Sequence, residues 1–94
     1  MRPAIYILTN ELETVLYIGV TSNLGQRIRA HRAGLFEGFS KRYNLHKLIY
    51  WEPHATMQSA IAREKQLKSW SRSRKEKLIE SLNPYHKELM EEND

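Results

Sequence analysis

The chain contains no cysteine among its 94 residues, and it has only three prolines and four glycines. The absence of cysteine excludes a disulfide-stabilised scaffold and a thiolate zinc site, and it fits the reducing cytoplasm. No apolar run approaches the roughly 20 residues that a membrane-spanning helix needs, and the N-terminus lacks the apolar segment of a signal peptide. We therefore expect a cytoplasmic protein that does not engage a membrane.

Several widespread active-site motifs are also missing. The sequence has no HExxH zinc motif, no Walker phosphate-binding loop and no GxGxxG dinucleotide motif. The four histidines, His31, His46, His54 and His86, show no regular metal-ligand spacing. The formal net charge of +4 at pH 7 permits a polyanionic partner but does not require one.

Length and composition predict one small domain. Hydrophobic residues make up 40% and charged residues 28% of the chain, which is ordinary for a globular protein and argues against disorder. A chain this short buries only about two-thirds of its unfolded surface, so each buried polar group is costly. The last seven residues carry four acids and no base. We therefore assign residues 1–86 to one domain and residues 87–94 to an acidic, frayed tail.

Runs of apolar and β-branched residues predict three strands. Residues 4–9 form a continuous run that is typical of a central strand, and residues 14–20 form a second run. The short polar connection between them predicts an antiparallel hairpin. A third strand is predicted over residues 46–52, where Pro53 ends it.

Periodicity and capping residues predict three helices. The first begins after Asn23, with Gln26 as its capping-box partner, and ends near Ala33. The second runs over residues 56–68, and the third opens with a capping box at residues 73–76. The order strand, strand, helix, strand, helix, helix predicts an α/β protein of the α+β class, in which three helices flank a small three-stranded antiparallel sheet.

Four residues of the predicted hairpin and first helix can act on one anionic group. Tyr6 and Tyr17 lie in the middle of their strands, and Arg27 and His31 lie four residues apart on the helix. Two phenols, a guanidinium and an imidazole suit a phosphodiester. Each residue also has an ordinary structural interpretation, because tyrosines favour strands, Arg27 can be a solvated charge and His31 a half-buried histidine.

Glu64 falls in the apolar stripe of the second predicted helix, beside Met57, Ala60 and Ile61. A lone ionised carboxylate in such a position loses hydration, at a cost on the order of several kcal/mol, so it needs a cation nearby. One interpretation is a buried ion pair with Arg27 or a lysine. The other is a metal ion bound in a cleft. Periodicity leaves both interpretations open.

A basic segment follows this glutamate. Residues 65–77 carry six lysines and arginines against one acid. Such a run is usually a solvated face, while Trp70 within it is either a core residue or a surface on which a base can rest. The candidate nucleic-acid-binding residues are Lys41, Arg42, Lys65, Lys68 and Arg72.

Together these residues resemble the GIY-YIG nuclease family. No single triplet is specific, but the ordered set with these gaps is, and the resemblance covers roughly residues 3 to 84. The size is similar to that of the small stand-alone bacterial members. The matching residues are Ala4-Ile5-Tyr6, Tyr17-Ile18-Gly19, Thr21-Ser22-Asn23-Leu24, Arg27, His31, Glu52 and Ala62-Arg63-Glu64.

One departure from the family pattern concerns the first triplet. It begins with Ala4 where the family name has glycine. Alanine adds one methyl group and is compatible with a strand, so we expect the strand and the activity to persist.

The resemblance implies a divalent-metal-dependent endonuclease that hydrolyses phosphodiester bonds in DNA by direct attack of water. It implies that Glu64 holds Mg²⁺ or Mn²⁺ and that Arg27 contacts the scissile phosphate. Tyr6 and Tyr17 would line the water site, one of them as general base. His31 would assist proton transfer, and Asn83 matches the family's late asparagine.

Other functions remain open at this point. One is a nucleic-acid-binding module that does not cut, or that cuts only with a protein partner, because 94 residues leave little room for a separate specificity domain. Another is a structural or protein-interaction role in which Glu64 is paired in the core. RNA stays open as a substrate, and cutting both strands of a duplex would favour a homodimer.

Overall fold

A central antiparallel sheet organises the computed structural model, which describes residues 2–34 and 42–89. The middle strand of this sheet, β1 (Ala4–Thr9), lies between β2 (Leu16–Thr21) and β3 (Lys47–Pro53). Neighbouring strands are antiparallel on both sides of β1. The predicted three-stranded antiparallel sheet is therefore confirmed.

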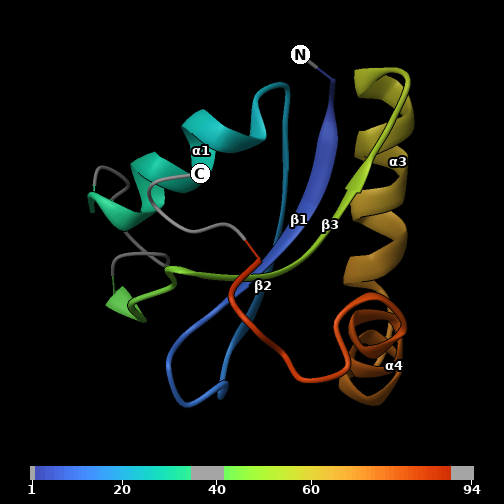
Figure 1. Ribbon diagram of the computed structural model, residues 1–94. Helices are drawn as coiled ribbons and strands as arrows, with labels where there is room; N and C mark the ends of the chain where they lie inside the picture. The colour runs from blue at the N-terminus through green and yellow to red at the C-terminus, as the bar shows by residue number, and fades with distance from the viewer. Residues whose placement is uncertain (1, 35–41, 90–94) are drawn as a thin grey trace.

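Helices cover both faces of the sheet. Helix α1 (Leu24–Arg32) packs on one face. Helices α3 (Met57–Lys68) and α4 (Arg72–Leu82) pack on the other, and Figure 1 shows the sheet between α1 and α3. The predicted α+β class and its element order are confirmed for the described residues. None of the helices in these residues is long and apolar enough to cross a bilayer.

Successive side chains of the fully buried strand β1 point to opposite faces of the sheet, so they contribute to two separate cores. Tyr6 and Leu8 face α1, whereas Ile5 and Ile7 face α3 and α4. The core on the α1 face also contains Ile28, Leu45 and Leu48. The core on the opposite face also contains Ile18, Ile49, Tyr50, Ala60, Leu67 and Ile79.

The hairpin turn is longer than predicted, so β2 begins at Leu16 rather than at residue 14. The side-chain oxygen of Asn10 accepts hydrogen bonds from the backbone N–H groups of Thr14, at 2.9 Å, and Val15, at 3.1 Å. These two N–H groups therefore form their hydrogen bonds within the turn. Glu13 adopts a positive φ of 56°, which lets the chain reverse direction here.

Asn23 caps α1 as predicted. Its side-chain oxygen accepts from the Gln26 N–H at 3.2 Å. The return contact of the capping box differs, because the Asn23 N–H already donates to the Thr21 hydroxyl at 3.0 Å. Gln26 instead accepts from the Asn23 side-chain amide at 3.4 Å. Thr21 and Asn23 together fix the direction in which α1 leaves β2.

The predicted start of the last helix is wrong by two residues. The N-cap is Ser71, whose hydroxyl accepts from the Arg74 N–H at 3.2 Å, and α4 begins at Arg72 rather than after Ser73. The earlier start brings the Arg72 guanidinium to the hairpin turn, where it donates to the carbonyl oxygens of Glu13 and Thr14. This contact ties α4 to the opposite end of the sequence.

Residues 87–89, which the sequence assigns to a frayed tail, pack against the sheet. Glu88 accepts from the Leu48 N–H at 2.9 Å and forms an ion pair with Arg32. The Leu89 N–H donates to the Leu48 carbonyl at 2.9 Å, and Leu89 packs on the α1-face core. The remainder of the predicted tail, residues 90–94, lies outside the described residues.

A network centred on Glu52 joins β3 to the start of α3. The Glu52 carboxylate accepts from Arg63 at 3.0 Å and from the Tyr50 hydroxyl at 2.8 Å. His54 contacts the same carboxylate at 2.8 Å and Ser59 at 2.6 Å. Although burial alone would raise it, the pKa of Glu52 is lowered by these hydrogen bonds, Arg63 foremost. The network fixes the helix that carries Glu64.

We expect Glu52→Gln to lower the free energy of unfolding by about 1–3 kcal/mol at pH 7. Because the folded pKa of Glu52 lies below its ordinary 4.5, the stabilisation is present above that value and is lost as the pH falls through the folded pKa. The difference in the free energy of unfolding between the parent and Glu52→Gln should therefore become smaller as the pH falls. Urea denaturation over a pH series measures it.

The matched control is Glu76→Gln, which breaks an exposed ion pair with Arg72. It should cost less than about 1 kcal/mol. A gap between parent and Glu52→Gln that stayed constant down to about pH 3 would contradict a role for the Glu52 charge.

Candidate active site

The two tyrosines of the sequence pattern come from adjacent strands on the face covered by α1. Tyr6 on β1 pairs with Gly19 on β2, and Tyr17 lies two residues before this glycine. Directly opposed residues and residues two apart point to the same face of a sheet. Tyr6 has no exposed surface, while Tyr17 is half-buried at the border of the same core.

Gly19 is required by the position of the Tyr6 ring. A Cβ built on Gly19 would collide with the Cζ and hydroxyl oxygen of Tyr6. The ring of Tyr6 therefore lies across the backbone of β2, with its hydroxyl end over Gly19. The glycine of the second triplet has a steric function here rather than a conformational one.

Helix α1 brings Arg27 and His31 to these rings. Ile28, which is fully buried, anchors the helix on the sheet, and His31 is only 8% exposed. The Tyr6 hydroxyl lies 3.2 Å from Nε2 of His31, and Tyr6 also shares a hydrogen bond with Arg27. The predicted meeting of two phenols, a guanidinium and an imidazole is thus present in the structure.

The three rings form a compact triangle. Ring centroids are separated by 6.3 Å between Tyr6 and Tyr17, by 5.9 Å between Tyr6 and His31, and by 5.8 Å between Tyr17 and His31. The imidazole meets both phenol rings edge-on. Such packing favours fixed ring orientations, which is what a proton-transfer site requires.

Burial decides the protonation states in this cluster. Burial, with a contribution from Tyr17, raises the pKa of Tyr6 to about 12, although Arg27 acts in the opposite direction. Burial therefore outweighs Arg27, which on its own would favour the phenolate form of Tyr6. Burial and the Arg27 charge both lower the pKa of His31. At neutral pH a protonated phenol therefore faces a neutral imidazole, which can accept its hydrogen bond at Nε2.

Glu64 comes from the other layer of the molecule. Its helix, α3, packs on β2 and β1 from the face opposite α1. The Glu64 side chain is 16% exposed and lies 3.3 Å from the Lys68 ammonium. Ala60 and Leu67 on the same stripe are fully buried, whereas Ile61 is 37% exposed, so the apolar stripe is narrower than predicted. The metal role of Glu64 stays a prediction.

The donor set suits a metal ion that is held mainly by water and substrate. Among residues 2–34 and 42–89, no group of three or more His, Cys, Asp or Glu side chains could hold a metal ion. Mg²⁺ commonly binds through one or two carboxylates and completes its shell with waters and substrate phosphates. A half-buried carboxylate whose partner, Lys68, is 56% exposed fits that mode.

The predicted nucleic-acid-binding residues are dispersed. Lys41 lies outside the described residues, and Arg42 is exposed with its guanidinium 5.6 Å from the Tyr43 ring centroid. Lys65 and Lys68 lie on the exposed side of α3. Arg72 is engaged by the hairpin carbonyls and by Glu76. Their contact with nucleic acid stays a prediction.

Asn83, the late asparagine, is bound within the fold. It is 5% exposed, and its amide donates to the carbonyl oxygens of Ile49, at 2.9 Å, and Lys87, at 2.8 Å. Its side-chain oxygen accepts from the Lys87 N–H at 3.0 Å. These contacts give Asn83 a structural role, because they hold the segment after α4 against β3.

One feature of the structure, a hollow beside Arg27, was not predicted from the sequence, and a second, the position of Trp70, was left open between core and surface. A hollow of about 250 Å³ beside Arg27 is lined by Thr21, Asn23 and Gln26, among others. Trp70 packs beside the core and is contacted by the guanidinium groups of Arg63, at 5.3 Å, and Arg74, at 3.8 Å, from its ring centroid. The polar run around Asn23 was a signal for the first, but it was interpreted only as a helix cap.

Comparison with known proteins settles the family. The GIY-YIG catalytic domain matches residues 2–77. The chain belongs to the GIY-YIG family. This domain belongs to a nuclease superfamily, so a nuclease-type activity on nucleic acid is supported at a general level.

Small bacterial and archaeal proteins are similar over most of the chain. The UPF0213 protein of Clostridium perfringens is 36% identical over 89 residues, which cover 95% of this chain and 89% of that protein. The UPF0213 protein of Natronomonas pharaonis is 33% identical over 75 residues, or 80% of this chain and 87% of that one. The predicted similarity to small members of the family is thus confirmed, and such relatives also occur in archaea.

A solved structure agrees with the fold. The solution structure of the UPF0213 protein from Bacillus halodurans superposes with a TM-score of 0.58 at 25% sequence identity. The superposition covers 92% of each chain. The GIY-YIG fold of this protein is therefore shared with a protein of the same size class.

We expect Gly19→Ala to displace the Tyr6 ring and to lower the free energy of unfolding by about 1–3 kcal/mol, because the added methyl cannot be accommodated without moving the ring. Urea denaturation measures this change. Gly25→Ala is the control, since its Cβ would meet only the flexible end of Arg29, and a helical Gly→Ala change is neutral or stabilising by up to about 1 kcal/mol. Equal effects of the two substitutions would be inconsistent with the steric role of Gly19.

Arg27→Gln should raise the pKa of His31 toward its ordinary value of 6.5, because the substitution removes a neighbouring positive charge while burial remains. An NMR titration of the imidazole ring protons measures this pKa. Arg29→Gln removes the same charge from an exposed position of α1 and should shift it less. A His31 pKa that responds equally to both variants would show that Arg27 is not its specific neighbour.

Proposed function

We propose that this protein is a divalent-metal-dependent endonuclease that hydrolyses phosphodiester bonds in DNA, with RNA open as a second substrate. The observation that carries the proposal is the cluster of Tyr6, Tyr17, Arg27 and His31 on one face of a GIY-YIG domain. The cluster joins a cationic group to a proton-transfer pair, which are two of the elements that the proposed hydrolysis uses beside the metal ion.

Arg27 is suited to bind the scissile phosphate. Its guanidinium borders the polar hollow that Thr21 and Asn23 also line. A guanidinium can donate two parallel hydrogen bonds to phosphate oxygens. Because negative charge grows on those oxygens during hydrolysis, the same contact stabilises the transition state more than the bound substrate.

Tyr6 and His31 are suited to move a proton from the attacking water. A phenol with a pKa of about 12 is almost never ionised at neutral pH. A relay avoids the need for a phenolate: a water that enters the cluster gives a proton to the Tyr6 oxygen while the Tyr6 proton passes to Nε2 of His31, 3.2 Å away. Because Tyr6 is fully buried, the relay requires the cluster to open to that water. The lowered pKa of His31 keeps its imidazole neutral and ready to accept that proton.

Glu64 would hold Mg²⁺ or Mn²⁺ at the open edge of β2. This strand is at the border of the sheet, α1 follows it directly, and α3 packs on it from the other face. A nucleic-acid strand lying along that edge would be within reach of residues from both layers. When bound, the ion supplies positive charge for the non-bridging and leaving oxygens of the phosphodiester. Lys68 would have to release the carboxylate.

A second candidate function is nucleic-acid binding without cleavage, or cleavage only with a protein partner or a second copy of the chain. The observation that favours it is the ion pair between Glu64 and Lys68, which already satisfies the carboxylate. In this case the exposed lysines and arginines would give salt-dependent affinity without hydrolysis. The cytoplasmic location inferred from the lack of cysteine is part of both proposals.

Glu64→Gln should reduce cleavage of branched, flapped, single-stranded and duplex DNA by on the order of 100-fold or more in Mg²⁺ or Mn²⁺. The reason is that the amide cannot replace the charge of a metal-binding carboxylate. Gel-based cleavage assays measure the rate, and a salt-dependent binding assay tests whether affinity is retained.

Glu76→Gln serves as the control because it removes a comparable ion pair, four residues apart on a helix, from α4. It should cut at the parent rate. The endonuclease proposal fails if the parent cuts no substrate with either metal, or if Glu64→Gln cuts as fast as the parent. Retained binding without any cutting by the parent would support the second candidate function.

A further inference from the structure

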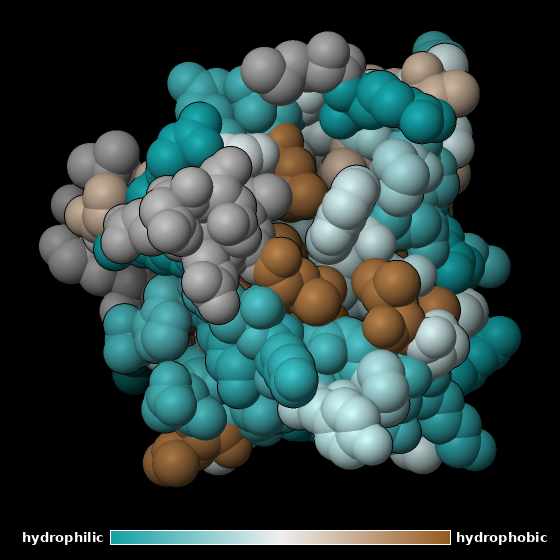
Figure 2. Space-filling model, in the orientation of Figure 1, coloured by the Kyte–Doolittle hydropathy of each residue, from teal (hydrophilic) through white to brown (hydrophobic). Residues whose placement is uncertain are grey.

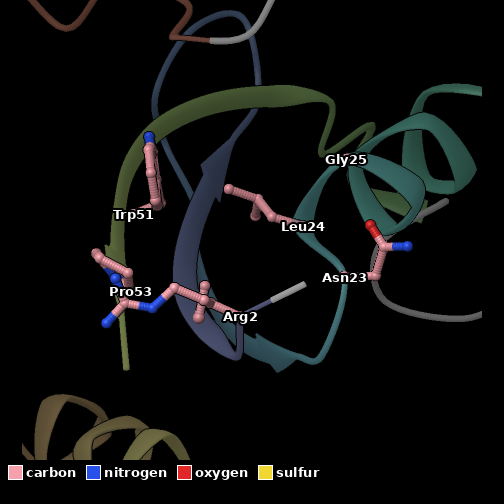
Figure 3. Close-up of a pocket in the computed structure, with 7 residues that line it drawn as sticks. Arg2, Asn23, Leu24, Gly25, Trp51 and Pro53 are labelled. Carbon is pink, nitrogen blue, oxygen red and sulfur yellow. The ribbon is translucent and has the colours of Figure 1, made fainter. Parts of the chain in front are cut away.

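A hollow between α1 and the sheet has the size and lining of a ligand site. It has a volume of about 380 Å³, which lies within the range of small-molecule pockets, about 300–1,000 Å³. In Figure 3, Leu24 extends from the start of α1 toward Trp51 on β3, and Pro53 and Arg2 lie below them. We call it the Trp51 pocket; the residues used below are Arg2, Ala4, Asn23, Leu24, Trp51 and Pro53.

The Trp51 pocket adjoins the candidate active site. Trp51 on β3 pairs with Tyr6 on β1, and Tyr6 pairs with Gly19 on β2, so the three residues form one row across the sheet. Directly opposed residues share a face, which places the Trp51 ring next to Tyr6. Tyr6 is fully buried, but Trp51 is 38% exposed. A large aromatic surface is therefore open to solvent beside the reactive cluster.

A polar and an apolar hollow lie next to each other here. Asn23 lines both the Trp51 pocket and the smaller hollow that contains Arg27. The apolar lining of the Trp51 pocket comes from Ala4, Leu24, Trp51 and Pro53. Figure 2 shows a few hydrophobic residues in the middle of the face seen there, with more hydrophilic residues around them. A ligand that fills both hollows must join a flat apolar group to an anion. A nucleotide has this construction.

We propose that the Trp51 pocket binds the nucleobase adjacent to the phosphate that Arg27 holds, with the base stacked on the Trp51 ring and flanked by Leu24 and Pro53. Arg2 at the same pocket supplies a cation for the next backbone phosphate. This assignment rests on the proposed function. Because every nucleobase has a π-face, stacking contributes affinity and position with little sequence preference.

Binding of two eight-nucleotide single strands, measured without divalent metal, tests the proposal. One probe is oligothymidylate, and the other carries the same backbone with tetrahydrofuran in place of every base. In a Trp70→Phe background the protein's tryptophan fluorescence comes from Trp51 alone. Oligothymidylate should quench this fluorescence and bind about tenfold more tightly than the abasic strand, since stacking of one base is worth about 1–3 kcal/mol.

Trp51→Leu should abolish that tenfold preference, and Trp51→Phe should retain most of it. Tyr85→Leu, which removes an 82% exposed aromatic ring elsewhere, should leave it unchanged. Circular dichroism confirms that each variant is folded; if Trp51→Leu is not, the quenching result and Trp51→Phe decide.

An unquenched Trp51, or an unchanged base preference in Trp51→Leu, would overturn the pocket assignment while leaving the endonuclease proposal intact. A base preference that depends on Trp51 in a protein that cuts nothing would support the pocket and reject only the hydrolysis. If the parent binds neither strand, the pocket assignment is overturned, whereas the endonuclease proposal is decided separately by the cleavage assays with Mg²⁺ or Mn²⁺.

Discussion

The hydrogen bond between the Tyr6 phenol and the His31 imidazole is the contact on which the candidate site depends. Tyr6 is a large polar side chain with no exposed surface, in the middle of the central strand. Leaving its hydroxyl without a partner would cost about 1–3 kcal/mol. His31, held in place by α1, supplies one partner at 3.2 Å, and Arg27 on the same helix supplies another. Strand β1 and helix α1 are thus joined by the same atoms that the proposed reaction would use.

The two faces of the sheet have different roles. The α1 face contains the aromatic cluster, the Arg27 hollow and the Trp51 pocket. The opposite face contains the larger aliphatic core, and on this face the Glu52 network joins β3 to α3. Glu64 belongs to this second layer. Under the proposed function, an ion held by Glu64 and the Arg27 side chain would act on the phosphate from different layers of the molecule.

The sequence carried enough information for the fold and for part of the site. Six consecutive β-favouring residues defined β1, and Asn23 defined the start of α1, because both signals are local. Spacing alone grouped Arg27 with His31. The raised pKa of Tyr6 could not be predicted, since it depends on how deeply the finished core buries the ring. The placement of Glu64 could not be predicted either, because a helical period shows which side of a helix is apolar but not which face of a sheet the helix covers.

The Trp51 pocket could not be predicted from local sequence patterns either. Trp51 stands beside Tyr6 only because β3 pairs with β1 in one register, and a bulge between Ile7 and Leu8 shifts that register further along the strands. A contact between residues so far apart in the sequence is decided by tertiary packing. Residues 46–52 could therefore be predicted to form a strand, but the residue that pairs with Trp51 could not be predicted.

The segment that follows α4 has a consequence for self-association. β3 is an edge strand, and the Leu48 N–H and carbonyl on its open side are occupied by Glu88 and Leu89. Unpaired backbone groups on such an edge invite intermolecular strand addition and aggregation. A variant that lacks Glu88 and Leu89 would leave the Leu48 N–H and carbonyl without these partners, and a strand from another molecule could then pair with this edge.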